Sequence, residues 1–550
     1  MRCVFYFALG ITAVISGLEA QPPAPQIESI RRDQLKADVF FLAGDFFRGR
    51  LTGTPEYRIA AEYLASRFER LGLKPLAQDG FFHRFDLVLS RLGRDSDNRI
   101  TLNAAGRSKA GKLLEDFYPL IFSADGEAEG RLVFAGYGIV APKLGWNDYS
   151  ESIKDDIVVV LEGEPGADDP KSPFDGLVTS EYANAISKTL EAQSRGASAI
   201  VFVNPSHRGK GTRAFPASAR AYWPEKPPHL ERYTLASRAE RVRIPVLQLD
   251  PVWVEQAFGK TAGELKQRAE KPGAFIRSEN QSLRVAVALN RFIVEDRSVV
   301  GLLEGGDAQQ RQEAVFVTAH YDHNGATAEQ IFPGADDNAS GSAAVIEIAE
   351  AFVLAAQSGQ RPKRSVIFAI WGSEERCCGP LLGSWAWVEN PDWPLEKTVA
   401  VLNMDMIGRN EEVPETGGSK FNGLKPQTAQ SNAGSVNLLG WSYSPELSRM
   451  ADAANRKIDL RLLRRYDNNR SNLLRRSDQW PFLQRGVPSL FVHTGLHPDY
   501  HTPYDRPERI DYSKMERITR FVYQLSWDLA NADGRPRFLS PRTILPPEAE

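Results

Sequence analysis

Short, continuously apolar segments recur through the C-terminal half of the chain and constrain its fold more than any other feature. They include AVFVTA (314–319), SVIFAIW (365–371), VAVLNM (399–404) and SLFVHT (489–494). A helical pattern, SGSAAVIEIAEAFVLAA (340–356), follows the first of them, and another, MERITRFVYQLSWDLA (515–530), follows the last. Apolar strands that alternate with helices are typical of a parallel sheet covered on both faces. We therefore expect an α/β fold, a three-layer α/β/α sandwich with a mostly parallel central sheet.

Two further regions differ in texture. Residues 27–75 carry apolar side chains at spacings of three and four, which predicts helices on either side of the loop RGRLTGTPE, with Thr54 as a cap before Pro55. Residues 115–280 contain short β runs and one helical pattern, ISKTLEAQSRG. We interpret this region as an inserted β-rich domain. It would divide the main domain into residues 21–114 and 281–535, and an extended tail would follow at 536–550.

The N-terminal segment MRCVFYFALGITAVISGLEA has one basic residue, then an apolar run, then small residues near Ala20. This order predicts a secretory signal peptide at residues 1–20. The apolar run is shorter than the about 20 residues that a membrane span needs, so an uncleaved anchor is the less favoured alternative. We expect an exported protein, periplasmic or extracellular, without a stable membrane span after cleavage. The net charge of −3 argues against a nucleic-acid partner.

Polar residues follow the apolar segments where the strands end. His320, Asp322 and His323 follow the first, Glu374 and Glu375 the second, Asp405 the third, and His501 comes shortly after the fourth. The loop PGADDNASG adds Asp336 and Asp337 before the helix at 340–356. In such sheets ligands bind at the carboxyl ends of the strands. Clustered carboxylates need a counter-charge, and histidine with Asp or Glu is a zinc-type ligand set. The ligands are too many for one tetrahedral ion, so two ions that share a bridging carboxylate fit better.

Six separated motifs carry a resemblance: TAHYDHNG, PGADDNASGSAA, GSEER, LNMDMIG, SDQWPFLQRGVPSLF and DYHTPYD. They resemble, in order, those of the M28 family of zinc aminopeptidases, in the form with an inserted protease-associated (PA) domain. The resemblance covers about residues 27–530. VFAGYGIVAP and SKTLEAQSRGASAIVFVN look like the PA domain. The resemblance implies the zinc aminopeptidase fold and two Zn²⁺ ions per chain.

The family's roles carry over to matching residues. One zinc would be held by His320 and Asp405, the other by Glu375 and His501, with Asp337 as the bridge. Glu374 would be the general base, Asp322 would support His320, and Tyr500 would steady the oxyanion. The resemblance thus implies an exported exopeptidase that hydrolyses the N-terminal peptide bond of peptides with a free N-terminus, through a metal-bridging hydroxide.

Some alternatives stay open. Residues 456–476 contain seven arginines, which form either a solvated face with ion pairs or a clamp for a substrate carboxylate. The clamp would favour a metallo-carboxypeptidase or dipeptidase on the same fold. A non-enzymatic relative and a single-zinc glutaminyl cyclase are disfavoured, because every ligand position is filled. Cobalt or manganese could replace zinc.

Several neighbouring residues have less defined roles. We expect His323, His493 and His497 to support the ligands, and Asp336 is a candidate to bind the substrate α-amine. Cys377 and Cys378 lie in a short insertion after the acidic pair. They could form a vicinal disulfide, remain free thiols or ligate a metal. The sequence leaves open the preferred N-terminal residue and the oligomeric state.

Overall fold

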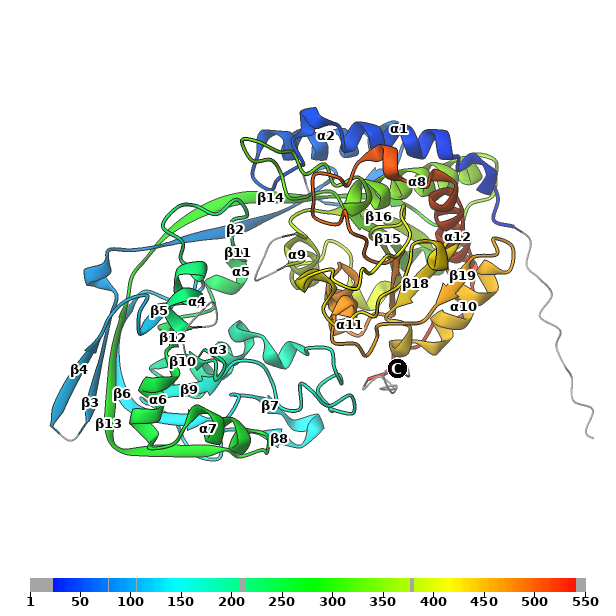
Figure 1. Cartoon of the computed structure of the whole chain (residues 1–550). Helices are drawn as coiled ribbons and strands as arrows, with labels where there is room; N and C mark the ends of the chain where they lie inside the picture. Colours follow the sequence, from blue (N-terminus) through cyan, green and yellow to red (C-terminus); the bar gives the residue numbers. More distant parts are fainter. Residues whose placement is uncertain (1–22, 78, 105, 208–213, 376–379, 541–550) are drawn as a thin grey trace, which may run out of the picture.

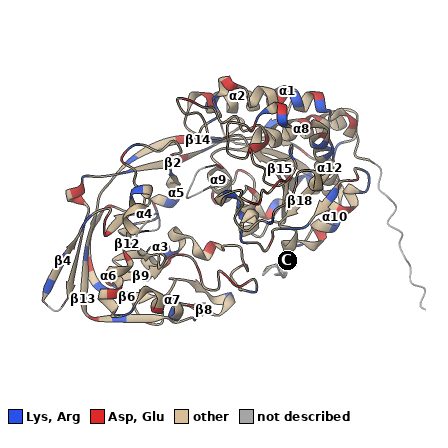
Figure 2. Cartoon of the chain, viewed as in Figure 1, with Lys and Arg blue, Asp and Glu red and all other residues tan. Residues whose placement is uncertain are grey.

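The computed structural model describes residues 23–77, 79–104, 106–207, 214–375 and 380–540, and the chain forms two bodies (Figure 1). Within these residues ten strands form one sheet and eight form a second. The predicted signal peptide and the vicinal cysteines lie outside the described residues, as does most of the predicted tail. Lys, Arg, Asp and Glu are interspersed over both bodies (Figure 2), in agreement with the small net charge.

The larger sheet is mixed. Its strand order is β11-β2-β14-β16-β15-β17-β20-β18-β19, with β1 beside β14. The strands are β1 (Lys74–Pro75), β2 (Phe82–Leu92), β11 (Tyr233–Leu235), β14 (Leu289–Leu303), β15 (Ala314–His320), β16 (Ser365–Trp371), β17 (Thr398–Met404), β18 (Ser435–Leu439), β19 (Arg461–Leu463) and β20 (Ser489–His493).

Parallel pairing joins β16, β15, β17 and β20, and also β18 with β19. The long β14 runs antiparallel to both β2 and β16, and β18 runs antiparallel to β20. The expected α/β class is therefore correct, but the sheet is parallel mainly at its centre. The flanking strands could not be placed from periodicity, because apolar runs alone do not give strand direction.

Helices cover both faces of this sheet. Alternate strand residues point to opposite faces, so Val315 and Val317 enter one hydrophobic cluster and Phe316 enters the other. The first face carries α1 (Arg32–Leu42), α2 (Pro55–Arg70), α8 (Gly341–Gln357), α10 (Pro445–Asn455) and α12 (Tyr512–Asn531). The second face carries α9 (Leu382–Glu389) and α11 (Gln479–Gln484).

The helices predicted near the N-terminus are present as α1 and α2. The hydroxyl of Thr54 accepts the backbone N–H of Tyr57, and Pro55 begins the helix, as expected. The segment Ala335–Gln357, which includes α8, is the one stretch of the described residues long and apolar enough to cross a membrane. Most of this segment is buried inside the protein, as in a core helix.

The second body contains the smaller sheet, in the order β4-β3-β13-β6-β9-β10-β12-β5. Its strands are β3 (Arg99–Ala104), β4 (Arg107–Gly111), β5 (Phe117–Pro119), β6 (Gly126–Ala135), β9 (Ile157–Leu161), β10 (Ala199–Val203), β12 (Val246–Leu249) and β13 (Phe275–Val287). A separate pair, β7 (Val140–Ala141) and β8 (Trp146–Asn147), lies nearby. The long strands β2 and β14 lead from one body to the other (Figure 1).

The predicted helix of this body is α3 (Ala185–Ser194). The sequence prediction missed α4 (Phe215–Tyr222), α5 (Ala236–Ala239), α6 (Pro251–Phe258) and α7 (Ala262–Ala269). Each is too short to show a full helical period over several turns. Residues 283–286 fall within the predicted second part of the main domain (281–535), yet they lie in β13 and pair with β3 and β6 of the second sheet.

Candidate metal centre

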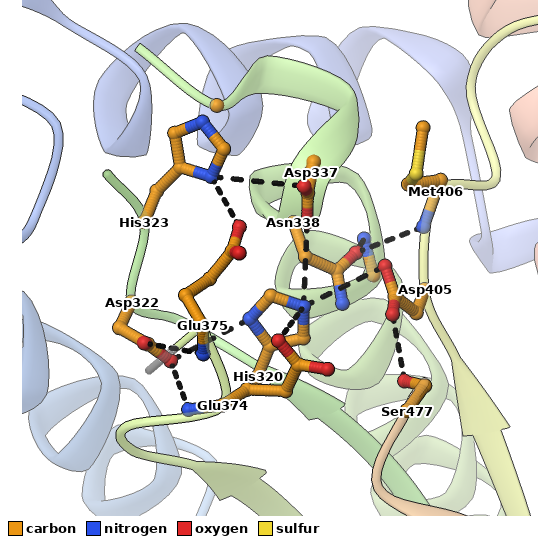
Figure 3. A network of polar contacts seen from close by, with 12 residues as sticks. His320, Asp322, His323, Asp337, Asn338, Glu374, Glu375, Asp405, Met406 and Ser477 are labelled. Atoms are coloured by element: carbon orange, nitrogen blue, oxygen red, sulfur yellow. Dashed lines mark hydrogen bonds and ion pairs between the residues drawn. The ribbon is translucent and has the colours of Figure 1, made fainter. Parts of the chain in front are cut away.

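The ends of β15, β16 and β17 bring the predicted ligands together (Figure 3). His320 is the last residue of β15, the Glu374–Glu375 pair follows β16, and Asp405 follows β17. Asp337 lies in the irregular turn Ala335–Ser340, which leads directly into α8. The Asp337–Asn338 peptide bond is cis. Parallel strands thus deliver side chains from distant parts of the sequence to one sheet edge.

The ligand atoms fall into two groups that share Asp337. In one, Nε2 of His320 lies 3.4 Å from Oδ1 of Asp337 and 3.5 Å from Oδ1 of Asp405. In the other, Nε2 of His501 lies 3.0 Å from Oδ2 of Asp337 and 3.0 Å from Oε2 of Glu375. Within each group the atoms all lie within 4.8 Å of one another. The two oxygens of Asp337 therefore face different groups, which is the arrangement of a bridging carboxylate.

The chemistry of these donors fits a pair of zinc ions. Asp337, Glu374 and Asp405 are almost fully buried beside His320, so their charges are poorly screened. Nε2 of His320 and Oδ1 of Asp405 are inaccessible to solvent, and neither has a hydrogen-bond partner among the described residues. Buried nitrogen and carboxylate oxygens of this kind are satisfied by a cation.

The pKa values of these groups report the same imbalance of charge. Burial alone would lower the pKa of His320, but the Glu374 and Asp405 carboxylates outweigh it and raise this pKa well above 6.5. Although burial also opposes the charged form of His501, the Glu375 and Asp337 carboxylates raise its pKa to about 10. The imidazoles thus sit in a strongly negative environment, which favours any cation.

His323 lies closer to the centre than the sequence indicated. Its Nδ1 is 2.7 Å from Oε1 of Glu375 and 3.8 Å from Oδ2 of Asp337, within the second ligand group. Two histidines therefore flank Glu375, His323 at one oxygen and His501 at the other. A signal was present in TAHYDHNG, because His323 stands three residues after His320.

The other flanking histidines lie outside both groups. Nδ1 of His493 contacts the backbone oxygen of Asp405 at 2.9 Å. Nε2 of His497 lies 3.3 Å from Oδ2 of Asp336, whose Oδ1 accepts the N–H of Gly408. Asp336 is thus fully buried and engaged with the protein, which argues against its predicted contact with a substrate amine.

Glu374 and Tyr500 line a small cavity beside the ligands. Oε2 of Glu374 lies 3.9 Å from Nε2 of His320, and burial raises the pKa of this carboxyl well above 4.5. The ring of Tyr500 contacts that of His501 in a tilted arrangement, with ring centroids 3.8 Å apart. Burial and the nearby Asp337 and Glu375 raise the pKa of its phenol well above 10, so the phenol keeps its proton at neutral pH.

The cavity beside the centre has a volume of about 30 Å³. It is lined by Asp337, Glu374, Glu375, Asp405, Met406, Leu473, Arg476, Phe491, His493, Leu496 and Tyr500. Its wall combines the acidic groups of the candidate metal centre with apolar side chains and one arginine. A cavity of this size admits a small group rather than a folded chain.

Arg476 differs from the other arginines of residues 456–476 because it lines the cavity. Arg464 pairs with Asp452 at 2.6 Å, and Arg470 pairs with Asp168. Arg465 pairs with Glu411, and Arg475 pairs with Glu181. Most of the cluster is therefore a network of ion pairs, and Arg476 is the member that faces the candidate site.

Asp322 supports both sides of the centre from behind. Its Oδ1 lies 3.6 Å from Nδ1 of His320 and accepts the N–H of Glu374 at 2.9 Å. Its Oδ2 accepts the N–H of Glu375 at 3.1 Å. The fully buried carboxylate thus fixes the backbone of the acidic pair and faces the far nitrogen of the histidine.

Asp505 fixes the backbone at Asp337, as Asp322 does at the acidic pair. Its Oδ1 accepts the N–H of Asp336 at 3.0 Å, and its Oδ2 accepts the N–H of Asp337 at 3.0 Å. In addition, Ser477 donates to Oδ2 of Asp405 at 2.6 Å, which leaves Oδ1 directed at His320. Ser477 and Asp505 both lie within the motifs of the resemblance, but nothing in the sequence predicted these contacts.

Arg50 was missed entirely by the sequence reasoning. Its fully buried guanidinium donates to the backbone oxygens of Leu42, Tyr321, Pro333 and Gly334 at 2.6–2.9 Å. It thereby ties the end of α1 to the loops that carry His320 and Asp337. Burial lowers its pKa to about 10, so it still carries a positive charge at neutral pH. An arginine in a loop before a helix has no sequence signal that distinguishes it from an exposed one.

The backbone is left-handed beside several of these residues. The φ angles are +52° at Ser373, +57° at Met406 and +57° at His501. Such conformations cost roughly 1–3 kcal/mol for residues other than glycine and concentrate at functional sites. Each of the three positions is, or directly adjoins, a predicted ligand or base.

Comparison with known proteins gives the family. Residues 298–526 match the sequence model of peptidase family M28. A probable zinc metalloprotease of Pyrenophora tritici-repentis is 28% identical over 303 residues, 50% of this chain and 60% of that protein. A probable leucine aminopeptidase of Trichophyton verrucosum is 26% identical over 227 residues, 40% of this chain and 55% of that protein.

Among solved structures, the aminopeptidase from Aneurinibacillus sp. strain AM-1 aligns with 95% of this chain and 98% of that chain. Its sequence is 15% identical and the TM-score is 0.45. The chain spans 55–60% of the length of the two relatives named above. The family match covers β15, β16, β17 and β20 and every residue of the two ligand groups. The part of the chain that holds both ligand groups, residues 298–526, therefore carries the sequence pattern of peptidase family M28.

Proposed function

We propose that the protein is a zinc aminopeptidase with two zinc ions per chain, on a three-layer α/β/α domain. The position of Asp337 carries this proposal, because its two oxygens face separate groups of histidine and carboxylate ligands. His320 and Asp405 would hold one ion, and Glu375 and His501 the other, with His323 beside the second. The relatives named as a zinc metalloprotease and a leucine aminopeptidase support the choice of metal and of reaction.

Zinc ions bound there would lower the pKa of water and polarise the scissile carbonyl. Glu374 is placed to act as the general base, because it lines the cavity without belonging to either ligand group. It would take the proton of the attacking water and later pass it to the leaving amine. Burial raises the pKa of its carboxyl well above 4.5, which makes the carboxylate a stronger base for this transfer.

Tyr500 would act on the oxyanion. It lines the same cavity as Glu374 and keeps its phenolic proton. A phenol directed at a developing negative charge stabilises the transition state more than the ground state. Asp322 would act only through its contacts with His320 and the acidic pair, as a positioning residue.

The acidic lining favours a substrate with a free N-terminus. Glu374 and Asp405 both line the cavity, where their carboxylates would attract a substrate ammonium group. Such a group is lost when the N-terminus is acetylated. The acidic end of the cavity therefore favours an aminopeptidase over an endopeptidase.

Arg476 supports a second candidate, a carboxypeptidase or dipeptidase. It lies on the cavity wall, where its guanidinium could pair with the carboxylate of a short peptide. The two candidates differ in which end of the substrate must be free. Hydrolysis of dipeptides that are N-acetylated, C-amidated or unmodified tests both. An aminopeptidase tolerates the C-terminal amide and rejects the acetyl group; the reverse result would establish the carboxypeptidase.

We further propose that the second body is a PA domain and that the protein is exported. The first rests on the resemblance of residues 133–142 and 187–204, and the second on the composition of residues 1–20. Peptides are then the expected substrates outside the cytoplasm. Mass spectrometry of the N-terminus of the protein from its native source, in the exported and membrane fractions, tests export and cleavage near Ala20. A full-length N-terminus in the membrane fraction would instead establish an anchor.

A further inference from the structure

A segment of the second body packs into the first. Residues 168–181, here called the strap, precede α3 and lie against residues 468–480, here called the wall segment. The wall segment precedes and begins α11 (Figure 1). Most apolar residues of the second body form their own hydrophobic cluster. Val178 of the strap instead belongs to the cluster of the first body, together with Leu473, Leu474 and Trp480.

Asparagine side chains of the wall segment bind the backbone of the strap. Oδ1 of Asn468 accepts the N–H of Leu177 at 2.8 Å, and its Nδ2 donates to the oxygen of Pro170 at 2.9 Å. Oδ1 of Asn472 accepts the N–H of Thr179 at 2.8 Å. Backbone groups of the strap thus find their partners across the boundary between the bodies, so the contact is specific rather than a loose approach.

Glu181 adds a charged contact at the end of the strap. Its Oε1 accepts the indole N–H of Trp480 at 2.8 Å and lies 3.2 Å from Nη2 of Arg475. Nη1 of Arg475 donates to the oxygen of Thr179 at 2.7 Å. Arg475 is therefore held by both a side chain and a backbone oxygen of the strap. Its neighbour in sequence is Arg476, which lines the cavity.

The strap is also fixed within the second body. The buried carboxylate of Glu164 accepts both the N–H and the hydroxyl of Ser180. Gly176 has a φ of +68°, and a side chain there would collide with Asn468. The strap is thus held at its base and closely fitted to its partner. It can transmit the position of the second body to the wall segment.

The wall segment supplies groups to the candidate active site. Leu473 and Arg476 line the cavity, and Ser477 donates to Oδ2 of the predicted ligand Asp405 at 2.6 Å. We infer that Asn468 and Glu181 are positioning residues, through which the strap holds Leu473 and Arg476 at the substrate-binding cavity. The second body would then help to set which substrates fit. This inference rests on the proposed peptidase function only for its effect on kinetics.

The test uses the full-length chain with Asn468→Ala and Glu181→Ala combined. Lys171→Ala is the matched control, because Lys171 is exposed on the same strap. Amide hydrogen exchange of residues 468–480 is measured first and needs no activity. We expect faster exchange in the double variant and no change in the control. Unchanged exchange in the double variant would overturn the inference.

Kinetic measurements then distinguish residues that position the cavity wall from residues that only stabilise the fold. We expect kcat/KM to fall about tenfold in the double variant, chiefly through KM, and its dependence on the substrate side chain to change, because small misplacements of positioning groups are costly. Glu181→Gln, which keeps an oxygen for Trp480, should restore part of the loss when it replaces Glu181→Ala. If the double variant and the wild type had equal kcat/KM for every substrate, the inference would be overturned. A wild-type protein without peptidase activity would contradict the proposed function and leave the exchange result to decide the inference.

Discussion

Oδ1 of Asp322 lies 3.6 Å from Nδ1 of His320, on the side of the imidazole away from the ligand group. A carboxylate in this place orients a histidine and makes it a stronger ligand. Asp322→Asn should weaken metal binding about 10–100-fold, the usual effect of removing such a partner. Competition with a coloured chelator measures the affinity. Asp86→Asn, at an exposed position on β2, is the control and should bind metal as the wild type does. Equal affinities in the two variants would exclude this role for Asp322.

The neighbours Glu374 and Glu375 should respond differently to the same change. Glu374→Gln should keep the metal and lose about 10²–10⁴-fold in kcat, the range expected for a general base. Glu375→Gln should lose metal, because Glu375 lies in the second ligand group and Glu374 does not. Each variant is the control for the other, since the change in charge is identical. Near-normal turnover by Glu374→Gln would remove it from the mechanism.

Asp505 should matter for metal binding although it is in neither ligand group. Its carboxylate accepts the N–H groups of Asp336 and Asp337, and an amide oxygen can replace only one of its two oxygens. Asp505→Asn should therefore reduce bound metal and lower the free energy of unfolding by about 1–3 kcal/mol. Elemental analysis and denaturant unfolding measure the two effects. Asp533→Asn, at an exposed position, should change neither.

Glu347 predicts a pH dependence of stability that is independent of the site. It is buried on α8, and burial, together with the charge of Glu350, raises its pKa from 4.5 to about 8. Between these values the folded state holds a proton that the unfolded state has released. Glu347 therefore contributes stability at low pH that is lost as the pH rises toward about 8.

The isosteric variant Glu347→Gln removes this titration. Its free energy of unfolding, relative to that of the wild type, should increase from pH 5 to pH 8, by at most about 1.4 kcal/mol per pH unit. Urea unfolding at several pH values gives the difference, and Glu329→Gln, at an exposed position, serves as the control. A difference between Glu347→Gln and the wild type that is constant across this range would refute the assignment.

The elements that the sequence predicted best are those whose residues repeat regularly. The central strands are apolar throughout, and α8 and α12 carry long periodic patterns, so their existence followed from local composition. The same logic placed His320, Glu375 and Asp405 at one edge, because parallel strands end together. The positions of the strand ends were thus enough to predict that these polar residues are neighbours.

Contacts between distant segments could not be obtained in this way. Arg50 reaches the loops at Tyr321 and Gly334 only through the folded chain, and Asp505 reaches Asp337 across a turn whose shape local sequence does not give. The same is true of the strap, whose asparagine partners lie about 300 residues away. Short helices such as α6 and α7 carry too few residues to display a period.

The most direct test of the account is the amount of metal that the chain binds. The purified protein is dialysed with zinc, freed of excess metal and measured by elemental analysis, beside an Asp337→Asn variant. We expect two zinc ions per wild-type chain and a loss from both positions in the variant, because Asp337 faces both ligand groups. No bound metal in the wild type after reconstitution would contradict the account at its centre.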